Sequence, residues 1–275
     1  MHSPDAKRRG MKAQASEGYE VLAVRYGTRQ AAASEVFLNY HSYGERDRPL
    51  GMDYFFWVIR GQDRTMVVDT GFSAQGGASR GRTALLSTAQ ALEQADVLPG
   101  GADQVVVTHA HYDHIGGLPA FGLPEVIMTE AEYDFWTGPM AARQQFAAYA
   151  EQDEIGHLRE LRASGRLTLT RGACQVAPGV DLLPVGGHTP GQAIVTVRAG
   201  PGQVILTSDA VHYYAELEQD RPFAIVADLP AMYAAYDQIR ELERASGAVV
   251  VAGHDPEVRS RFPARAGHEN VIRVA

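Results

Sequence analysis

Four of the six residues in the segment HAHYDH, at positions 109–114, have side chains that commonly bind metal ions. The β-branched run Val105–Val107 comes directly before the segment, and Gly116 and Gly117 close it. This order predicts a short buried strand followed by a loop that carries the histidines. In layered α/β folds, ligands gather at the carboxyl ends of strands. The segment therefore favours a fold in which strand ends meet around a bound ion.

The spacing within the segment divides its four polar side chains into two pairs. His109 and His111 are two residues apart on an extended backbone, so they point the same way and can hold one cation. Asp113 and His114 continue round the turn and can face a second cation. The alternative is a solvated histidine-rich loop that binds metal only by accident. We favour the metal site, because chance rarely produces this spacing of these residue types.

Three further candidate ligands each follow an apolar run that is typical of a strand. His188 follows LLPVGG, Asp209 follows VILTS, and His254 follows VVVAG. Each would be weak evidence alone, since a single histidine at a strand end is more often structural. Because all of these segments end strands, one rim of the fold can collect their side chains.

Composition limits the partners and the compartment that we expect. The formal net charge of −8 argues against a nucleic-acid partner. No run of about 18 apolar residues is present, which excludes an ordinary membrane span. Cys174 is the only cysteine, so no internal disulfide can form, and nothing indicates an oxidising compartment. Residues 1–18 lack the apolar stretch of a signal peptide, so we expect a flexible N-terminal tail and a cytoplasmic location.

Short strands and helical segments alternate along the rest of the chain. Strands are predicted at 19–26, 54–60, 65–69, 105–107, 125–129, 167–170, 180–185, 193–197, 204–207 and 248–252, and helices at 82–95, within 130–163 and at 229–245. Two sets of strands with helices at their outer edges indicate an α/β fold, a four-layer αββα sandwich. We expect one domain over residues 19–275.

Two segments bear on the substrate pocket. Residues 30–52 are polar and irregular, so we expect a long loop at the edge of the pocket. Residues 130–163 fit two or three helices, which provide either a homodimer contact or a lid. Their aromatic side chains line a pocket or pack in the core, and core packing is the expected role for most of them; they are Phe135, Trp136, Phe146 and Tyr149.

The sequence resembles the metallo-β-lactamase superfamily of binuclear metal hydrolases, and within it the N-acyl homoserine lactonase-like branch. The resemblance extends over residues 19–263. The motifs that carry it are DYFFW at 53–57, VDTGF at 68–72, THAHYDHIGG at 108–117, GHTPG at 187–191 and SDA at 208–210.

The resemblance implies a set of ligands for two metal ions. His109, His111 and His188 would hold the first ion, Asp113, His114 and His254 would hold the second, and Asp209 would bridge the two. Imidazole nitrogens mixed with carboxylate oxygens suit zinc, which we expect, with manganese, iron or cobalt as alternatives.

The resemblance also implies a reaction on a small-molecule substrate. A hydroxide held between the two cations would attack the carbonyl of a small lactone, and Asp113 would pass a proton to the leaving oxygen. Asp69 matches a family position that orients ligands, although an ordinary turn acid at a strand end is an equal interpretation. The alternatives are hydrolysis of another ester, a thioester, an amide or a phosphoester, and a redox or non-catalytic binding protein on the same scaffold.

Two positions depart from the lactonase pattern. Lactonases place a tyrosine three residues after the bridging aspartate, to contact the lactone carbonyl, whereas this chain has His212 there, followed by Tyr213. We expect either His212 or Tyr213 to make that contact, with a structural role for His212 as the alternative. Gln192 stands where the lactonase pattern often has a histidine.

Overall fold

The computed structural model describes residues 18–275 apart from residues 99 and 123. The tail predicted over residues 1–18 therefore lies outside the described residues, except for Gly18. Among the residues described, no helix is both long and apolar enough to cross a membrane.

The larger of two mixed sheets contains nine strands. Its order is β13-β14-β1-β2-β3-β5-β6-β7, with β4 also paired to β1. The pairs from β3 to β7 are parallel, and the pairs among β14, β1, β2 and β3 are antiparallel. The strands are β1 Glu20–Ala32, β2 Pro49–Arg60, β3 Thr65–Val68, β4 Thr83–Ala84, β5 Gln104–Val106, β6 Glu125–Thr129, β7 Leu167–Thr170, β13 Ala264–Arg265 and β14 His268–Arg273.

The smaller sheet has five strands in the order β12-β11-β10-β9-β8. Only its β11–β12 pair is parallel. The strands are β8 Cys174–Ala177, β9 Val180–Pro184, β10 Ala193–Ala199, β11 Gly202–Leu206 and β12 Val249–Val251.

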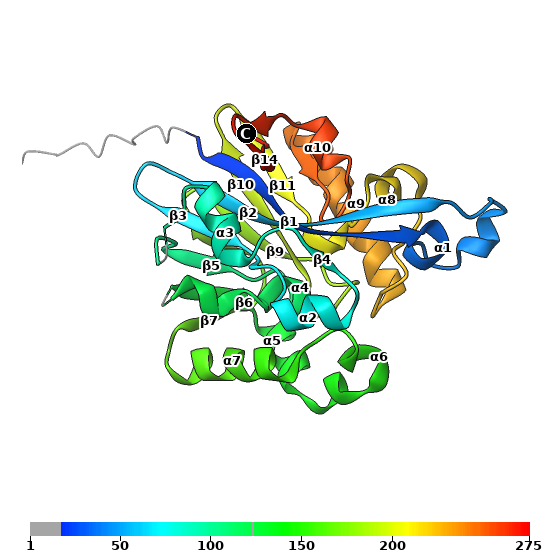
Figure 1. Cartoon of the computed structure of the whole chain (residues 1–275), viewed down its shortest axis with the longest axis horizontal. Coiled ribbons are helices and arrows are strands. Elements are labelled where there is room, and N and C mark those ends of the chain that lie inside the picture. Colours follow the sequence, from blue (N-terminus) through cyan, green and yellow to red (C-terminus); the bar gives the residue numbers. More distant parts are fainter. Residues whose placement is uncertain (1–17, 99, 123) are drawn as a thin grey trace, which may run out of the picture.

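Helices cover the outer faces of both sheets (Figure 1). Helices α3, α5 and α7 lie on the side of the larger sheet, and α9, drawn in orange, lies on the side of β11. The helices are α1 Ala33–Val36, α2 Ala74–Ser79, α3 Thr88–Gln94, α4 Tyr112–Ile115, α5 Glu130–Thr137, α6 Gln144–Ala147, α7 Gln152–Ala163, α8 Tyr214–Gln219, α9 Leu229–Ser246 and α10 Val258–Arg261, with 3-10 turns η1 Tyr40–Tyr43, η2 Leu118–Phe121, η3 Pro139–Ala142 and η4 Ser208–Ala210.

Alternation along β1 explains why the larger sheet has a core on each face. Val21 and Ala23 belong to the apolar cluster shared with the smaller sheet and α9, whereas Leu22 and Val24 belong to the cluster under the other helices. Successive side chains of a strand point to opposite faces, so an apolar run of this kind buries both faces. The predicted four-layer αββα sandwich is confirmed.

Residues 30–52 do not form the long irregular loop that we predicted. β1 continues to Ala32 and β2 begins at Pro49, and the two pair in register from Gly27 with Tyr54 to Ala32 with Pro49. Figure 1 shows this ribbon reaching one end of the molecule, with α1 at its tip. Backbone hydrogen bonds of a hairpin do not require apolar side chains, and for this reason the polar composition was misleading.

The predicted boundary of another segment also differs. The helix expected over residues 82–95 begins only at Thr88, because the Ser87 side chain caps the amide of Gln90 and the Gln90 side chain accepts from the amide of Ser87. The residues before it include the short strand β4. The polar C-terminal segment forms β14, which pairs with β1.

Candidate metal centre

All seven predicted ligands meet at one rim of the sandwich, between the two sheets. They come from the loops after β5, β9, β11 and β12, and each is between 0% and 6% exposed. We call these residues the metal cluster: His109, His111, Asp113, His114, His188, Asp209 and His254. Their ring nitrogens and carboxylate oxygens fall into two groups, within each of which the atoms lie within 4.8 Å of one another.

The first group contains His109, His111, His188 and Asp209. His188 Nε2 lies 3.0 Å from His111 Nδ1 and 3.3 Å from Asp209 Oδ2. His109 Nε2 lies 3.6 Å from the same Asp209 oxygen. Three imidazole nitrogens and one carboxylate oxygen thus point at one small volume.

The second group contains Asp113, His114 and His254, and Asp209 reaches it with its other oxygen. Asp209 Oδ1 lies 3.1 Å from His114 Nε2 and 3.0 Å from His254 Nε2. Asp113 Oδ1 lies 3.8 Å from His114 Nε2, and Asp113 Oδ2 lies 3.9 Å from His254 Nε2. One carboxylate therefore joins the two groups through its two oxygens.

Hydrogen bonds that two of the rings donate to backbone carbonyls fix their orientation. His188 Nδ1 lies 2.9 Å from the carbonyl oxygen of Ile225, and His254 Nδ1 lies 2.9 Å from that of Asp53. A carbonyl oxygen only accepts, so each Nδ1 must carry the proton. Each Nε2 is then left with a lone pair that faces the cluster, as a metal ligand requires.

Burial sets the charge of the first group. It holds the pKa of His109 and His111 well below the usual value and lowers the pKa of His188 to about 3, so these rings are neutral. Burial acts in the same direction on His114, but the carboxylates of Asp209 and Asp69 outweigh it and raise its pKa well above the usual value.

The cluster fits a pair of divalent cations. Nε2 of His109, Nε2 of His114 and Oδ1 of Asp209 are buried without a hydrogen-bond partner among the described residues. Leaving buried polar atoms unpaired costs about 1–3 kcal/mol each, so native structures rarely do so without a reason. Cations coordinated by these atoms would remove that cost, and the nitrogen and oxygen donors suit zinc and its neighbours.

Asp69 connects two of the loops that supply the cluster, those after β5 and β11. Its carboxylate accepts from the Thr108 amide at 2.9 Å and from the Ser208 hydroxyl at 3.0 Å. Its Oδ2 lies 2.8 Å from His114 Nδ1. The residue is fully buried, with a left-handed φ of 62°. These contacts suit an orienting role for Asp69 and go beyond those of an ordinary turn acid.

Glu132 is a second organising acid, and sequence reasoning missed it. It is fully buried at the start of α5 and accepts from the amides of Ala110 and Gly191, each at 2.9 Å. The Thr189 hydroxyl and the Trp136 indole also donate to it, at 2.7 and 2.6 Å. Glu132 thus ties the loop of His109 and His111 to that of His188. The available signal was an acid just past the strand Glu125–Thr129.

The two residues predicted to contact the substrate carbonyl lie in different places. His212 lines the cavity beside the cluster, with Nε2 3.0 Å from Asp209 Oδ2. Its ring stacks on Phe223 at a centroid distance of 3.6 Å. Burial would lower the pKa of His212, but the carboxylates of Asp209 and Glu216 raise it to about 9. A histidine ring carries at least one N–H group in either charge state, so the ring can donate a hydrogen bond.

Tyr213 points elsewhere. Its hydroxyl donates to the carbonyl of Gly51 at 2.9 Å, and its ring packs against Phe37. It does not line the cavity beside the cluster. Gln192 is also fully buried, and its amide nitrogen donates to the carbonyl of Ala193.

Two cavities adjoin the cluster. One, of about 40 Å³, opens directly onto Asp113, His212 and His254. The other, of about 210 Å³, shares His111 and His188 with it. The aromatic residues predicted in segment 130–163 all line the second cavity, although Trp136 is also buried in the core; they are Phe135, Trp136, Phe146 and Tyr149.

The family model of the metallo-beta-lactamase superfamily matches residues 53–254. The chain belongs to this superfamily. The match begins at the DYFFW motif and ends at the last histidine of the cluster, so it encloses every predicted ligand. The resemblance that the motifs indicated is confirmed.

Relatives within the metallo-beta-lactamase superfamily include lactonases. An N-acyl homoserine lactonase of a Bacillus species is 30% identical over 154 residues, which are 56% of this chain and 56% of the relative. The chain therefore spans little more than half the length of this relative. A probable metallo-hydrolase of Mycobacterium tuberculosis is 26% identical over 73% of this chain and 74% of its own.

Solved structures of the superfamily share the fold. Bacillus thuringiensis AiiA, with N-decanoyl-L-homoserine at its active site, aligns with a TM-score of 0.75 and 20% identity over 91% of this chain and 99% of its own. AidC, described as a dizinc quorum-quenching lactonase, aligns with a TM-score of 0.71 and 17% identity over 88% of this chain and 89% of its own.

Proposed function

We propose that this protein is a binuclear zinc hydrolase that opens small lactones such as N-acyl homoserine lactones. The observation that carries the proposal is Asp209, whose two oxygens face two separate groups of buried donor atoms. The named relatives and the product-bound structures with the same fold support the choice of a lactone as substrate. When bound, two such cations lower the pKa of a water and polarise a carbonyl group.

Two residues of this chain would serve the reacting atoms. Asp113 is 6% exposed and lines the cavity, where its carboxylate can hold a proton for the departing ring oxygen. His212 lines the same cavity and presents an N–H group, so we assign it the contact with the substrate carbonyl oxygen. Tyr213 is not assigned this contact, because its hydroxyl is bonded to Gly51.

The larger adjoining cavity would take an apolar substituent of the substrate. Its volume of about 210 Å³ and its aromatic lining suit an acyl group, which gains roughly 0.8 kcal/mol for each buried methylene. His111 and His188 of the metal cluster line this cavity, so an acyl group bound in it would lie next to the reacting carbonyl.

The test combines metal analysis with a substrate panel. Purified protein should contain about two zinc ions per chain, and it should hydrolyse lactones with higher kcat/KM than matched thioesters, amides or phosphoesters. Chelation should abolish turnover and added zinc should restore it. Undiminished lactone hydrolysis by metal-free protein, or higher kcat/KM on another class, would contradict the proposal.

A further inference from the structure

Two arginines line the cavity beside the metal cluster. Arg29 lies on β1 and Arg82 just before β4, and both line the 40 Å³ cavity together with Met52 and Tyr54. Neither residue belongs to the predicted ligand set. A cationic side chain at a buried rim needs a compensating charge, so the partners of both guanidinium groups matter.

Sheet register explains why the two side chains line the same cavity. β1 pairs with β4 through Gly27 with Ala84 and Thr28 with Thr83. Arg29 and Arg82 are the next residues of this antiparallel ladder, and on its other side Arg29 pairs with Met52. Residues directly opposite each other in a ladder project from the same face, and like charges there destabilise the pairing.

Among the described residues, the acids nearest to the two arginines compensate them only in part. The ion pair formed by Arg29 reaches Glu35 Oε2 at 3.9 Å, and that acid is 58% exposed. Arg82 donates its Nε–H to the Tyr112 hydroxyl at 2.9 Å, and its guanidinium lies 5.8 Å from the centroid of the Tyr54 ring. The metal-cluster carboxylates would themselves be compensated by bound cations. The two guanidinium groups therefore give the cavity a positive charge that the nearby acids compensate only in part.

The geometry points to a substrate that carries an anionic group, carboxylate or phosphate, held by Arg29 and Arg82 while its carbonyl lies at the metal cluster. This inference rests on the proposed function and refines it: lactones or esters that carry an anionic group would be preferred over neutral ones such as N-acyl homoserine lactones. Paired guanidinium groups bind such anions with several charge-assisted hydrogen bonds. The arginines would act as specificity-determining residues, because they contact the substrate at a distance from the bond that breaks.

The experiment compares one lactone in two charge states. The probes are γ-carboxy-γ-butyrolactone and its neutral carboxamide, with zinc-loaded protein. We expect kcat/KM for the carboxylate to exceed that for the carboxamide by about tenfold or more. In the double variant Arg29→Gln/Arg82→Gln, the ratio of the two values should fall to near one. Arg82→Lys should retain part of the preference. Arg273→Gln, which removes the same charge from an exposed site on β14 paired with Glu20, should leave it unchanged.

The possible outcomes separate this inference from the proposed function. Turnover of both lactones without preference, or a preference that survives in the double variant, overturns the inference and leaves the hydrolase intact. If neither lactone is turned over, the proposed function fails on these probes. In that case, a rise in Tm caused by glutarate in the wild type and lost in the double variant would support the arginine site by itself, and an unchanged rise would overturn it.

Discussion

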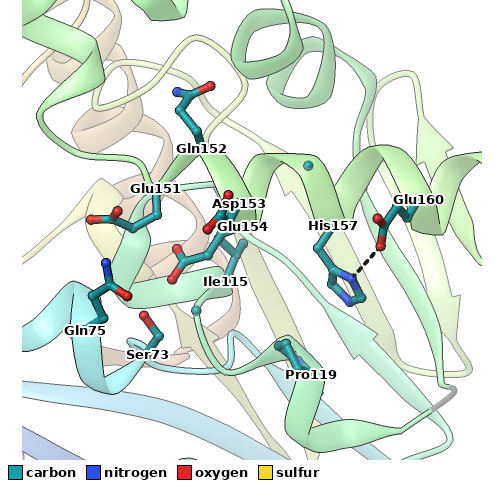
Figure 2. Close-up of a pocket in the computed structure, with 12 residues that line it drawn as sticks. Ser73, Gln75, Ile115, Pro119, Glu151, Gln152, Asp153, Glu154, His157 and Glu160 are labelled. Carbon is teal, nitrogen blue, oxygen red and sulfur yellow. Dashed lines mark ion pairs between the residues drawn. The ribbon is translucent and has the colours of Figure 1, made fainter.

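Two acid-rich regions lie on opposite sides of the loop at residues 109–117, and they differ in almost every other respect. On one side, Asp113 and His114 face the metal cluster. On the other side, Ile115 and Gly116 line a pocket of about 540 Å³ against the start of α7, which we call the α7 pocket. Figure 2 shows the acids of the α7 pocket: Glu151, Asp153, Glu154 and Glu160.

The donors of the metal cluster come from four loops and are buried, whereas the acids of the α7 pocket come from one stretch of chain. Asp153 and Glu160 are exposed, and Glu151 pairs with Arg80. The ion pair drawn in Figure 2 joins Glu160 to His157 at 3.5 Å. Acids in the first turn of a helix are stabilised by the helix dipole without any bound ion.

The comparison shows which features identify a metal site. The α7 pocket is larger and holds more carboxylates, and apart from the buried Glu154 its acids have solvent or a nearby cation to compensate them. In the metal cluster, the first group has neutral imidazoles, and unpaired buried atoms from different loops point toward one another, whereas the unpaired oxygens of the α7 pocket belong to Glu154 alone. Converging donors in a desolvated site distinguish a metal centre better than cavity volume or acid content.

The largest expected effect comes from Asp209→Ala. Removing the carboxylate that joins both groups should lower the bound zinc below two ions per chain and reduce kcat by about a thousandfold or more. Metal analysis and lactone turnover measure these changes. The control is Asp153→Ala in the α7 pocket, which should keep both values. Equal metal content in the two variants would place the metal outside the cluster.

A smaller effect is expected from Glu132→Gln. An amide at this position keeps one acceptor oxygen but turns an NH₂ group toward donors such as the Gly191 amide. We expect a loss of about 2–4 kcal/mol in the free energy of unfolding, measured in urea, together with weaker zinc binding.

The matched control for this change is Glu130→Gln on the same helix. Glu130 pairs with Arg171, which is 81% exposed, so the loss of this ion pair should leave the free energy of unfolding nearly unchanged. Similar losses in the two variants would mean that Glu132 does not hold the two loops together.

The parts of the fold that are apolar could be predicted from the sequence. β6 and β7 were predicted at their observed bounds, because β6 contains the buried apolar run Val126–Met128 and β7 alternates leucine with threonine. Residues 30–52 were mispredicted, since the pairing of β1 with β2 there depends on backbone hydrogen bonds and not on side-chain pattern.

In the candidate site, too, some residues could be predicted from the sequence and others could not. His188 and His254 could be predicted as ligands, because each follows an apolar run that is typical of a strand. Glu132 and Arg82 were not visible, because their roles depend on contacts between segments far apart in the chain, such as Glu132 with Gly191. Sequence reasoning also left open whether His212 or Tyr213 contacts the substrate carbonyl, and the choice of His212 remains a proposal, supported by the hydrogen bond from the Tyr213 hydroxyl to Gly51.

The smallest expected effect concerns the α7 pocket itself. Burial raises the pKa of Glu154 from 4.5 to about 7, so the folded protein holds this proton more tightly than the unfolded chain does. As pH rises from 4.5 towards 7, the unfolded state loses the proton first, and this group therefore lowers stability progressively. Below that pH range Glu154 does not change the stability, and above it the destabilisation has reached its full size.

Glu154→Gln should remove this pH-dependent loss. At about pH 8, we expect the free energy of unfolding in urea to be higher in this variant than in the wild type by on the order of 1 kcal/mol, a figure that already allows for solvent screening. At about pH 4, the two proteins should differ little. Glu160→Gln, at an exposed position of the same helix, should shift stability at neither pH. Zinc content should not change in either variant, because neither residue belongs to the metal cluster. A gain that is equal at both pH values would mean that packing, and not the buried carboxylate charge, separates this pocket from the metal cluster.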